Sequence, residues 1–298
     1  RLPPRSTLFP YTTLFRSPWF IIIGESGSGK TSAVKNTKLN SPLGDINPTG
    51  ISVTKNCDWW FFDEAIILDT AGRYTIPIDE GRDKEEWENF LTLLAKYRTR
   101  EPVNGIIVTI AADKLREAGE GALADEGLSV RRRIDQLMRI LGAKIPVYVL
   151  VTKIDLIPGM LEFSNLLPRK DRTQAMGYVN TDLDAGWEGV LDQSLATVSS
   201  RLRDLQFAIV HQGGAPEPEV FLFAQGFERL RSGLSYYVRS VFSSNPYQAT
   251  PPLRGVFFSS ALQEGKAERE FTGFLDAGSG EEKEDRKSTR LNSSHRIR

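Results

Sequence analysis

The stretch from Trp19 to Val34, WFIIIGESGSGKTSAV, decides the fold of this chain. Its first five residues, 19–23, are apolar and rich in isoleucine, which is typical of a buried parallel strand. The next eight fit the pattern G-x-x-x-x-G-K-[ST] at every fixed position, from Gly24 to Thr31. A helix is predicted over about 29–39. Strand, glycine-rich loop and helix therefore follow one another in the order that a phosphate-binding loop (P-loop) requires.

This spacing has a chemical reason. The loop glycines carry no Cβ, so the backbone can turn several N–H groups toward one anion. Lys30 is expected to reach the β- and γ-phosphates, and the Thr31 hydroxyl to coordinate Mg²⁺. The helix that opens at Ser32 adds its N-terminal dipole to the site. The predicted phosphate-binding residues are Gly24, Gly27, Ser28, Gly29, Lys30, Thr31 and Ser32.

Composition sets limits on the function. The chain has 298 residues, 40% hydrophobic and 26% charged, enough for one large α/β domain with an appendage. Its 38 basic residues match its 38 acidic ones, so charge gives no support for a nucleic-acid or membrane-surface partner. The single Cys57 cannot form an internal disulfide, which favours a reducing, cytoplasmic setting. No apolar run reaches the roughly 18 residues of a membrane span, so this fragment is expected to be soluble.

The two ends of the chain look foreign. RSTLFPYTTLFRS (5–17) and RKSTRLNSSH (286–295) resemble peptides obtained by translating sequencing-adapter DNA. We therefore expect artefact tails at 1–17 and 285–298 and a single domain over 18–284, truncated on both sides. The alternative is a genuine disordered tail at each end.

Strand and helix patterns alternate along the rest of the chain. Strands are predicted at 53–61, 65–68, 105–111, 145–151, 220–223 and 256–259, and helices at 84–97, 126–141, 191–209 and 227–242. This alternation predicts an α/β fold, a P-loop sheet of the GTPase type with helices on both faces. A hairpin at Asp63 would make one edge antiparallel. The segment from about 156 to 212 is expected to form a helical extension.

A second motif, Asp69-Thr70-Ala71-Gly72, follows an apolar strand. Asp69 would lie at the carboxyl end of that strand and face Mg²⁺ directly or through water. Gly72 would offer its backbone N–H to a γ-phosphate. Lys30, Asp69 and Gly72 are thus candidate catalytic residues. A threonine that senses the γ-phosphate should precede this strand, and Thr54 is favoured over Thr49.

A third motif, Thr152-Lys153-Ile154-Asp155, concerns the nucleobase. The Asp155 carboxylate can accept from N1–H and from the N2 amine of guanine, groups that adenine lacks. Lys153 would lay its aliphatic stem along the base plane. Ser260-Ala261 fits the small-residue loop that closes over a guanine in this fold. The alternative is a loop in which the side chains of Lys153 and Asp155 are solvated.

Arg73 directly follows Gly72, where small GTPases such as Ras place a glutamine that orients water. An arginine cannot accept a proton at neutral pH. Two roles therefore remain for Arg73, which we keep among the catalytic candidates. It acts as an arginine finger, or it pairs with Asp79 or Glu80, and the salt bridge is favoured.

Several longer segments carry a more specific resemblance. These are PWFIIIGESGSGKTSA, NCDWWFFDEAIILDTAGRY, PVNGIIVTIAADKL, IPVYVLVTKIDL and LRGVFFSSALQEG. They are similar to the cytoplasmic nucleotide-binding domain of the IcmF/TssM family, inner-membrane core components of type VI secretion systems, over nearly all of 18–265. The departures are small: Glu25-Ser26 stands where the family often has two prolines, and Ser260-Ala261 where it often has Ser-Gly.

The resemblance implies a domain at the cytoplasmic face of the bacterial inner membrane, within a longer, membrane-anchored and oligomeric protein. Its partners would be other membrane-core and baseplate components of the secretion system. Two functions are carried forward. The first is Mg²⁺-dependent binding and slow hydrolysis of GTP or ATP. The second is a structural scaffold that binds nucleotide weakly or without turnover.

Overall fold

The computed structural model describes residues 17–37, 39–41, 54, 56–99, 101–168, 174–182, 184–211, 218–246 and 248–261. All of them belong to one compact unit, Arg1–Ala267. The predicted tails, apart from Ser17, and Thr49 lie outside the described residues. Among the residues that are described, no helix combines the length and the apolar character needed to cross a membrane.

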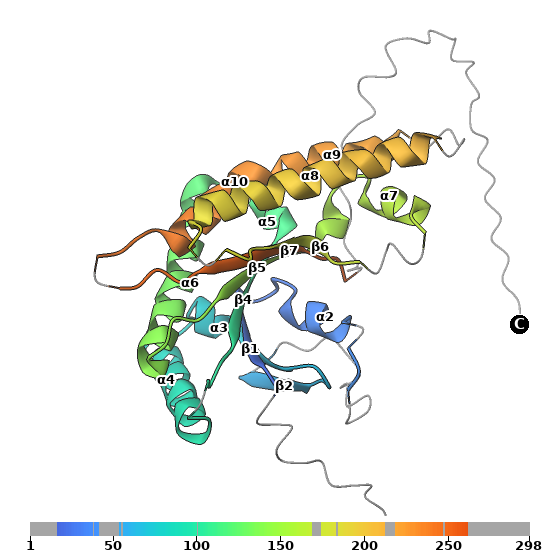
Figure 1. Ribbon diagram of the computed structural model, residues 1–298. Helices are drawn as coiled ribbons and strands as arrows, with labels where there is room; N and C mark the ends of the chain where they lie inside the picture. The colour runs from blue at the N-terminus through green and yellow to red at the C-terminus, as the bar shows by residue number, and fades with distance from the viewer. Residues whose placement is uncertain are drawn as a thin grey trace, which may run out of the picture. The chain divides into compact units, whose positions relative to one another are not determined.

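A mixed sheet of seven strands forms the centre of the described part, in the order β2-β3-β1-β4-β5-β7-β6 (Figure 1). The five inner strands run parallel, and the two edge strands, β2 and β6, run antiparallel to their neighbours. The predicted α/β P-loop fold, with its antiparallel edge at the hairpin, is therefore confirmed. The strands are β1 (Trp19–Ile23), β2 (Cys57–Phe61), β3 (Ile66–Thr70), β4 (Gly105–Ala111), β5 (Val147–Thr152), β6 (Met176–Val179) and β7 (Leu253–Phe258).

Side-chain alternation divides the core between the two faces of the sheet. In β1, Ile21 and Ile23 join the larger hydrophobic cluster, while Ile22 joins a smaller one with Val34 of α2 (Lys30–Lys35) and Ile67 of β3. Successive residues of a strand point to opposite faces, so a continuous apolar run serves a strand that is covered on both sides. This is why the isoleucine run before the P-loop becomes a central strand.

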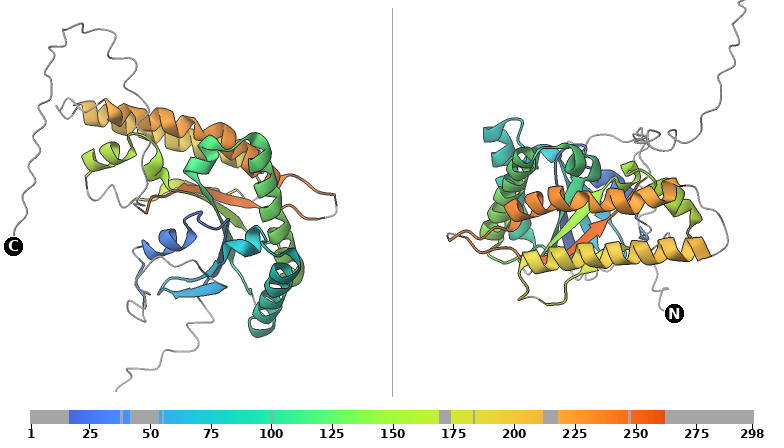
Figure 2. Two further views of the ribbon diagram at one scale, coloured as in Figure 1. Left: turned by 180° about the vertical axis from the view of Figure 1, so that it is seen from behind. Right: turned by 90° about the horizontal axis from the view of Figure 1, so that it is seen from above.

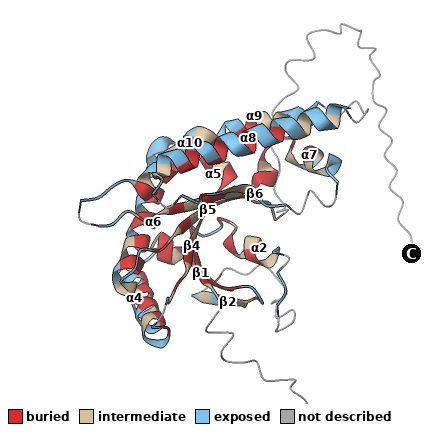
Figure 3. Ribbon diagram, in the orientation of Figure 1, coloured by how far each residue is buried: buried red, intermediate tan, exposed pale blue. Residues whose placement is uncertain are grey.

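The helices cover the two faces unequally. The short α2 lies on one side of the sheet, and α8, α9 and α10 lie on the other (Figures 1 and 2). Buried positions of α8 face β6 and β7, and those of α10 face the neighbouring helices α5 and α6, while the exposed positions of α8 and α10 face outward (Figure 3). The helices are α2 (Lys30–Lys35), α3 (Gly72–Thr75), α4 (Glu80–Tyr97), α5 (Ala112–Glu117), α6 (Glu120–Leu141), α7 (Met160–Leu166), α8 (Trp187–His211), α9 (Glu219–Glu228) and α10 (Leu230–Phe242), with a 3-10 turn at Ile154–Leu156.

Two sequence predictions are wrong in this region. The strand predicted at 220–223 lies inside α9, where Val220 and Phe223 are buried together one helical turn apart. A run of four apolar residues does not distinguish a strand from a buried helix turn. The segment at 156–212 contains α7 and α8 as expected, but also β6, which pairs with β7 and was not predicted.

Candidate functional site

The P-loop connects β1 to α2 and is fixed by the ends of two neighbouring strands. Gly27 and Gly29 have φ values of 78° and 84°, a left-handed conformation that glycine adopts without strain. The Thr152 hydroxyl at the end of β5 donates to the Ser28 carbonyl at 2.5 Å. The Ser28 hydroxyl lies 2.8 Å from that of Thr109 in β4. These two contacts fix the position of Ser28 in the loop.

Lys30 is buried at the first position of α2. Its ammonium donates to the carbonyls of Gly24 and Glu25, both at 2.8 Å, so the side chain folds back over the loop. Burial lowers the pKa of Lys30 to about 8, and the nearby Asp69 carboxylate opposes only part of that shift. An anion that enters the loop would stabilise the charged form of this lysine.

Three predicted oxygen-bearing side chains meet beside Lys30. The Thr31 hydroxyl donates to Asp69 Oδ2 at 2.6 Å and lies 3.2 Å from the Thr54 hydroxyl. Asp69 is fully buried, and burial raises the pKa of its carboxyl group. The structure thus brings Asp69 and Thr54 to Thr31, although they lie 38 and 23 positions from it in the chain.

This oxygen cluster fits a hard divalent cation. Hydroxyl and carboxylate oxygens are the ligands that Mg²⁺ prefers in proteins. Asp69 Oδ1 is buried and has no hydrogen-bond partner among the described residues. A buried carboxylate oxygen without a donor is costly, so a cation is the natural partner for it.

The segment after β3 lies in contact with the P-loop. Gly72 opens α3, and a Cβ at this position would lie 2.2 Å from the backbone nitrogen of Ser26. Thr75, at the end of the same helix, accepts a hydrogen bond from the backbone N–H of Gly24 at 3.1 Å. The predicted γ-phosphate contact, Gly72, therefore lies directly beside the loop.

The Arg73 side chain contacts α4. Its guanidinium pairs with Asp83 and, at 2.5 Å, with Glu86, and it also donates to Asn56 at 2.7 Å. The salt-bridge interpretation is correct, but the predicted partners Asp79 and Glu80 are wrong. Asp79 instead caps α4 by accepting from the Arg82 backbone N–H at 3.2 Å. The two acidic partners lie one and two turns into α4, where they face α3.

The candidate base-binding loop lies at the carboxyl ends of β5 and β7. Lys153 has a left-handed φ of 56°, which turns the chain sharply after Thr152. Asp155 is buried and accepts from the Ser260 hydroxyl at 2.5 Å. The structure thereby joins the two segments of the predicted guanine site, and Ala261 follows Ser260 at the end of the described chain.

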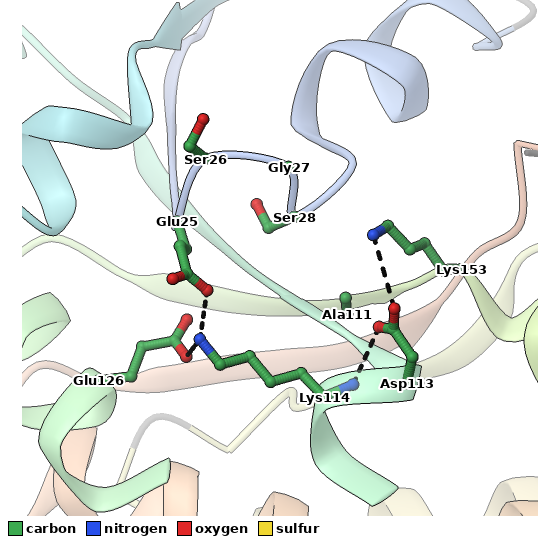
Figure 4. Close-up of a pocket in the computed structure, with 9 residues that line it drawn as sticks. All are labelled: Glu25, Ser26, Gly27, Ser28, Ala111, Asp113, Lys114, Glu126 and Lys153. Atoms are coloured by element: carbon green, nitrogen blue, oxygen red, sulfur yellow. Dashed lines mark hydrogen bonds and ion pairs between the residues drawn. The ribbon is translucent and has the colours of Figure 1, made fainter. Parts of the chain in front are cut away.

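A pocket of about 260 Å³ borders the P-loop and carries charges that sequence reasoning missed (Figure 4). Lys114 of α5 forms ion pairs with Glu25 of the loop and with the buried Glu126 of α6, the latter at 2.6 Å. On the other side, Lys153 lies 3.7 Å from Asp113. Burial raises the pKa of Glu126, although Lys114 opposes the shift. No local pattern marks Lys114 or Glu126, because their pairing depends on how the consecutive helices α5 and α6 pack, and Glu25 lies 89 positions from Lys114.

Comparisons with solved structures give weak overall similarity. A Trypanosoma brucei Arl6 (BBS3) small GTPase with a bound nucleotide analogue is 12% identical, with a TM-score of 0.28 over 47% of this chain and 69% of that one. The signal recognition particle receptor SRb-GTP/SRX complex from Chaetomium thermophilum gives 17% identity and a TM-score of 0.33, over 50% and 76%.

Sequence comparisons are more informative. Type VI secretion system component TssM1 of Pseudomonas aeruginosa is 40% identical over 264 residues, which cover 85% of this chain. The chain spans about a quarter of the length of that relative, 24%. The model of the IcmF-related N-terminal domain matches residues 80–296. The match covers more than half of the chain, from α4 through the base-binding loop, and the chain therefore belongs to the IcmF-related family.

Proposed function

We propose that this domain binds a nucleoside triphosphate, GTP or ATP, together with Mg²⁺ and hydrolyses it slowly as part of a type VI secretion membrane complex. The observation that carries the proposal is the meeting of Lys30, Thr31, Thr54 and Asp69 at the P-loop. A polar strand-end turn would not gather a buried lysine, a buried aspartate and two hydroxyls at one loop.

The residues have distinct roles in this proposal. The loop N–H groups and the Lys30 ammonium bind the phosphates, and Gly72 offers its backbone N–H beside Ser26. Thr31 and Asp69 would hold Mg²⁺, which would neutralise charge on the phosphate oxygens when bound. The Lys30 ammonium lowers the cost of the negative charge that develops as the terminal phosphate leaves.

Guanine is the base that the loop geometry favours. The buried Asp155 carboxylate accepts from N1–H and N2–H of guanine in this proposal, and the Ser260 hydroxyl, which donates to it, orients it. Adenine would present an acceptor at N1 to the same carboxylate and leave it unpaired. Such a mismatch in a buried site discriminates strongly between bases.

Competition among ATP, GTP and xanthosine triphosphate tests the base assignment. Asp155→Asn should weaken GTP binding at least about tenfold, or about 1.4 kcal/mol. Binding of xanthosine triphosphate should change far less, because xanthine carries an oxygen in place of the amine. Asp204→Asn, on the exposed face of α8, is the matched control and should change nothing. A wild-type domain that prefers ATP, or does not distinguish ATP from GTP, would show that this loop does not read guanine.

The surroundings of Arg73 favour a second candidate, a scaffold that binds nucleotide without turnover. The position after Gly72 holds Arg73, so it has no amide side chain to orient water. The Arg73 guanidinium is also held in ion pairs with Asp83 and Glu86. Nucleotide would then order loops and dock other membrane-core or baseplate components at the cytoplasmic face of the inner membrane. A single-turnover assay on the purified domain separates the two, since a scaffold leaves the bound triphosphate intact.

A further inference from the structure

We propose that Asp58, on the edge strand β2, is a further residue of the Mg²⁺ site and holds the cation together with Thr31 and Asp69. The inference rests on the proposed function. It concerns a residue that neither the P-loop nor the motif after β3 contains. Three observations carry it: the register of the hairpin, the count of protons in the cluster, and the unpartnered oxygen of Asp69.

The register places the two carboxylates opposite each other. In the antiparallel pairing of β2 with β3, Asp58 is the partner of Asp69, and Trp60 is the partner of Ile67. Trp60 and Ile67 belong to the small cluster that packs on α2, and residues two apart in a strand share a face. Asp58 and Asp69 therefore both lie on the α2 side of the sheet, beside Thr31.

The hydrogen bonds join all four side chains. Thr54 donates to Asp58 Oδ2 at 3.2 Å and lies 3.2 Å from the Thr31 hydroxyl, which in turn donates to Asp69 Oδ2 at 2.6 Å. Each hydroxyl has a single proton. The hydroxyl protons of Thr31 and Thr54 are both donated to carboxylates, so neither is left for the contact between the two threonines. The cluster has more acceptors than donors.

The charge balance points the same way. Lys30, the nearest cation in the described part of the site, donates to two loop carbonyls, while Asp69 Oδ1 stays buried without a partner. Two like charges facing one another on a partly buried surface are unfavourable unless a cation lies between them. Asp58 is exposed at the sheet edge, so it can act on the cation directly or through a bound water.

The change in nucleotide affinity on Asp58 substitution, measured with and without Mg²⁺, distinguishes a residue that holds the cation from a structural one. Without Mg²⁺, Asp58 only repels the phosphates, so Asp58→Asn should leave nucleotide affinity unchanged or tighten it. With Mg²⁺, the same substitution should raise the Mg²⁺ concentration for half-saturation about tenfold, as removal of a supporting residue does at metal sites. Asp63→Asn, in the turn of the same hairpin, is exposed and is the matched control.

The experiment measures binding rather than turnover. Fluorescent GTP and ATP are titrated into the full chain in EDTA and over a series of Mg²⁺ concentrations, for wild type, Asp58→Asn, Asp58→Ser and Asp63→Asn. Thermal unfolding checks that each variant is folded. Manganese with the bound nucleotide, followed by its paramagnetic resonance, reports directly on the cation.

Each result has a defined meaning. A loss of affinity confined to the Mg²⁺ series, in both Asp58 variants and not in Asp63→Asn, supports the assignment. An equal loss with and without the cation, or an unchanged half-saturation, overturns it while nucleotide binding stands. A wild-type domain that binds no nucleotide in either condition overturns the proposed function itself, and the assignment with it.

Discussion

Gly72 packs directly against the backbone of Ser26, so the segment that follows β3 and the phosphate-binding loop are in contact. A Cβ on Gly72 would lie 2.2 Å from the Ser26 nitrogen and 2.5 Å from its Cα. No flexible side chain can yield at this contact, since both atoms belong to the backbone. A displacement of α3 would therefore move the phosphate-binding loop, and a ligand that moves the loop would displace α3.

Gly72→Ala should therefore weaken triphosphate binding. The added methyl group must displace either the loop or α3, and we expect at least a tenfold loss of affinity, about 1.4 kcal/mol. Calorimetry with a triphosphate and with the matching diphosphate would measure it, and the loss should be larger for the triphosphate. Gly121→Ala, on the exposed first turn of α6 with no atom within 4 Å, is the control. An alanine variant at 72 that binds like wild type would show that the contact yields easily.

The ion pairs of Lys114 predict a stability effect. Lys114→Met would leave Glu126, whose side chain is 3% exposed, without its cation. Removing one partner of a buried pair costs about 3–5 kcal/mol, and the partial exposure of Lys114 puts this case near 3. Chemical denaturation should show the loss, and a second substitution, Glu126→Gln, should recover part of it. Lys84→Met, on the exposed face of α4, should be nearly neutral. A double variant no more stable than Lys114→Met would rule out an uncompensated charge as the cause.

Arg73 should behave as a structural residue that fixes α3 against α4. Its partner Asp83 is fully buried, so Arg73→Ala should destabilise the domain by about 2 kcal/mol. Thermal unfolding measures the effect. Arg82→Ala is the comparison, because its pair with the same Glu86 is exposed and spans 3.8 Å, and it should cost at most about 0.5 kcal/mol. A much slower single turnover in Arg73→Ala, with stability unchanged, would instead identify Arg73 as an arginine finger.

The sequence predicted the parts of this molecule that depend on local pattern. The P-loop is a contiguous motif, and the isoleucine run before it has the composition of a strand buried on both faces. Their place in the sheet follows, because the carboxyl ends of parallel strands meet at one edge. The same rule predicted that Asp69 and Asp155 lie at the edge of the sheet where Lys30 lies.

The parts that depend on pairs distant in the chain were missed. Lys114 meets Glu25 from 89 positions away, and β6 finds its partner β7 only in the folded sheet. The strand predicted at 220–223 is wrong because a buried helix and a buried strand both contain runs of apolar residues. The acidic partners of Arg73 lie one and two turns into α4 instead of at its start, because α4 begins at Glu80 and its inward face is set by packing on α3.

The pKa of Lys30 makes phosphate binding depend on pH. Burial lowers that pKa to about 8 in the free domain, below the ordinary value of 10.5. Between about pH 8 and 10.5 the unfolded chain holds more protons than the folded one, so the destabilisation caused by burying Lys30 shrinks as pH rises through that window.

Triphosphate affinity has the opposite trend with pH, because binding needs the charged ammonium of Lys30. At pH 9 about one molecule in ten carries the proton, and the affinity should fall about tenfold from its value at pH 7. Calorimetry at several pH values measures it, and Lys30→Met should bind weakly with no such dependence. A wild-type affinity that stays constant to pH 9.5 would show that Lys30 keeps its charge in the free loop.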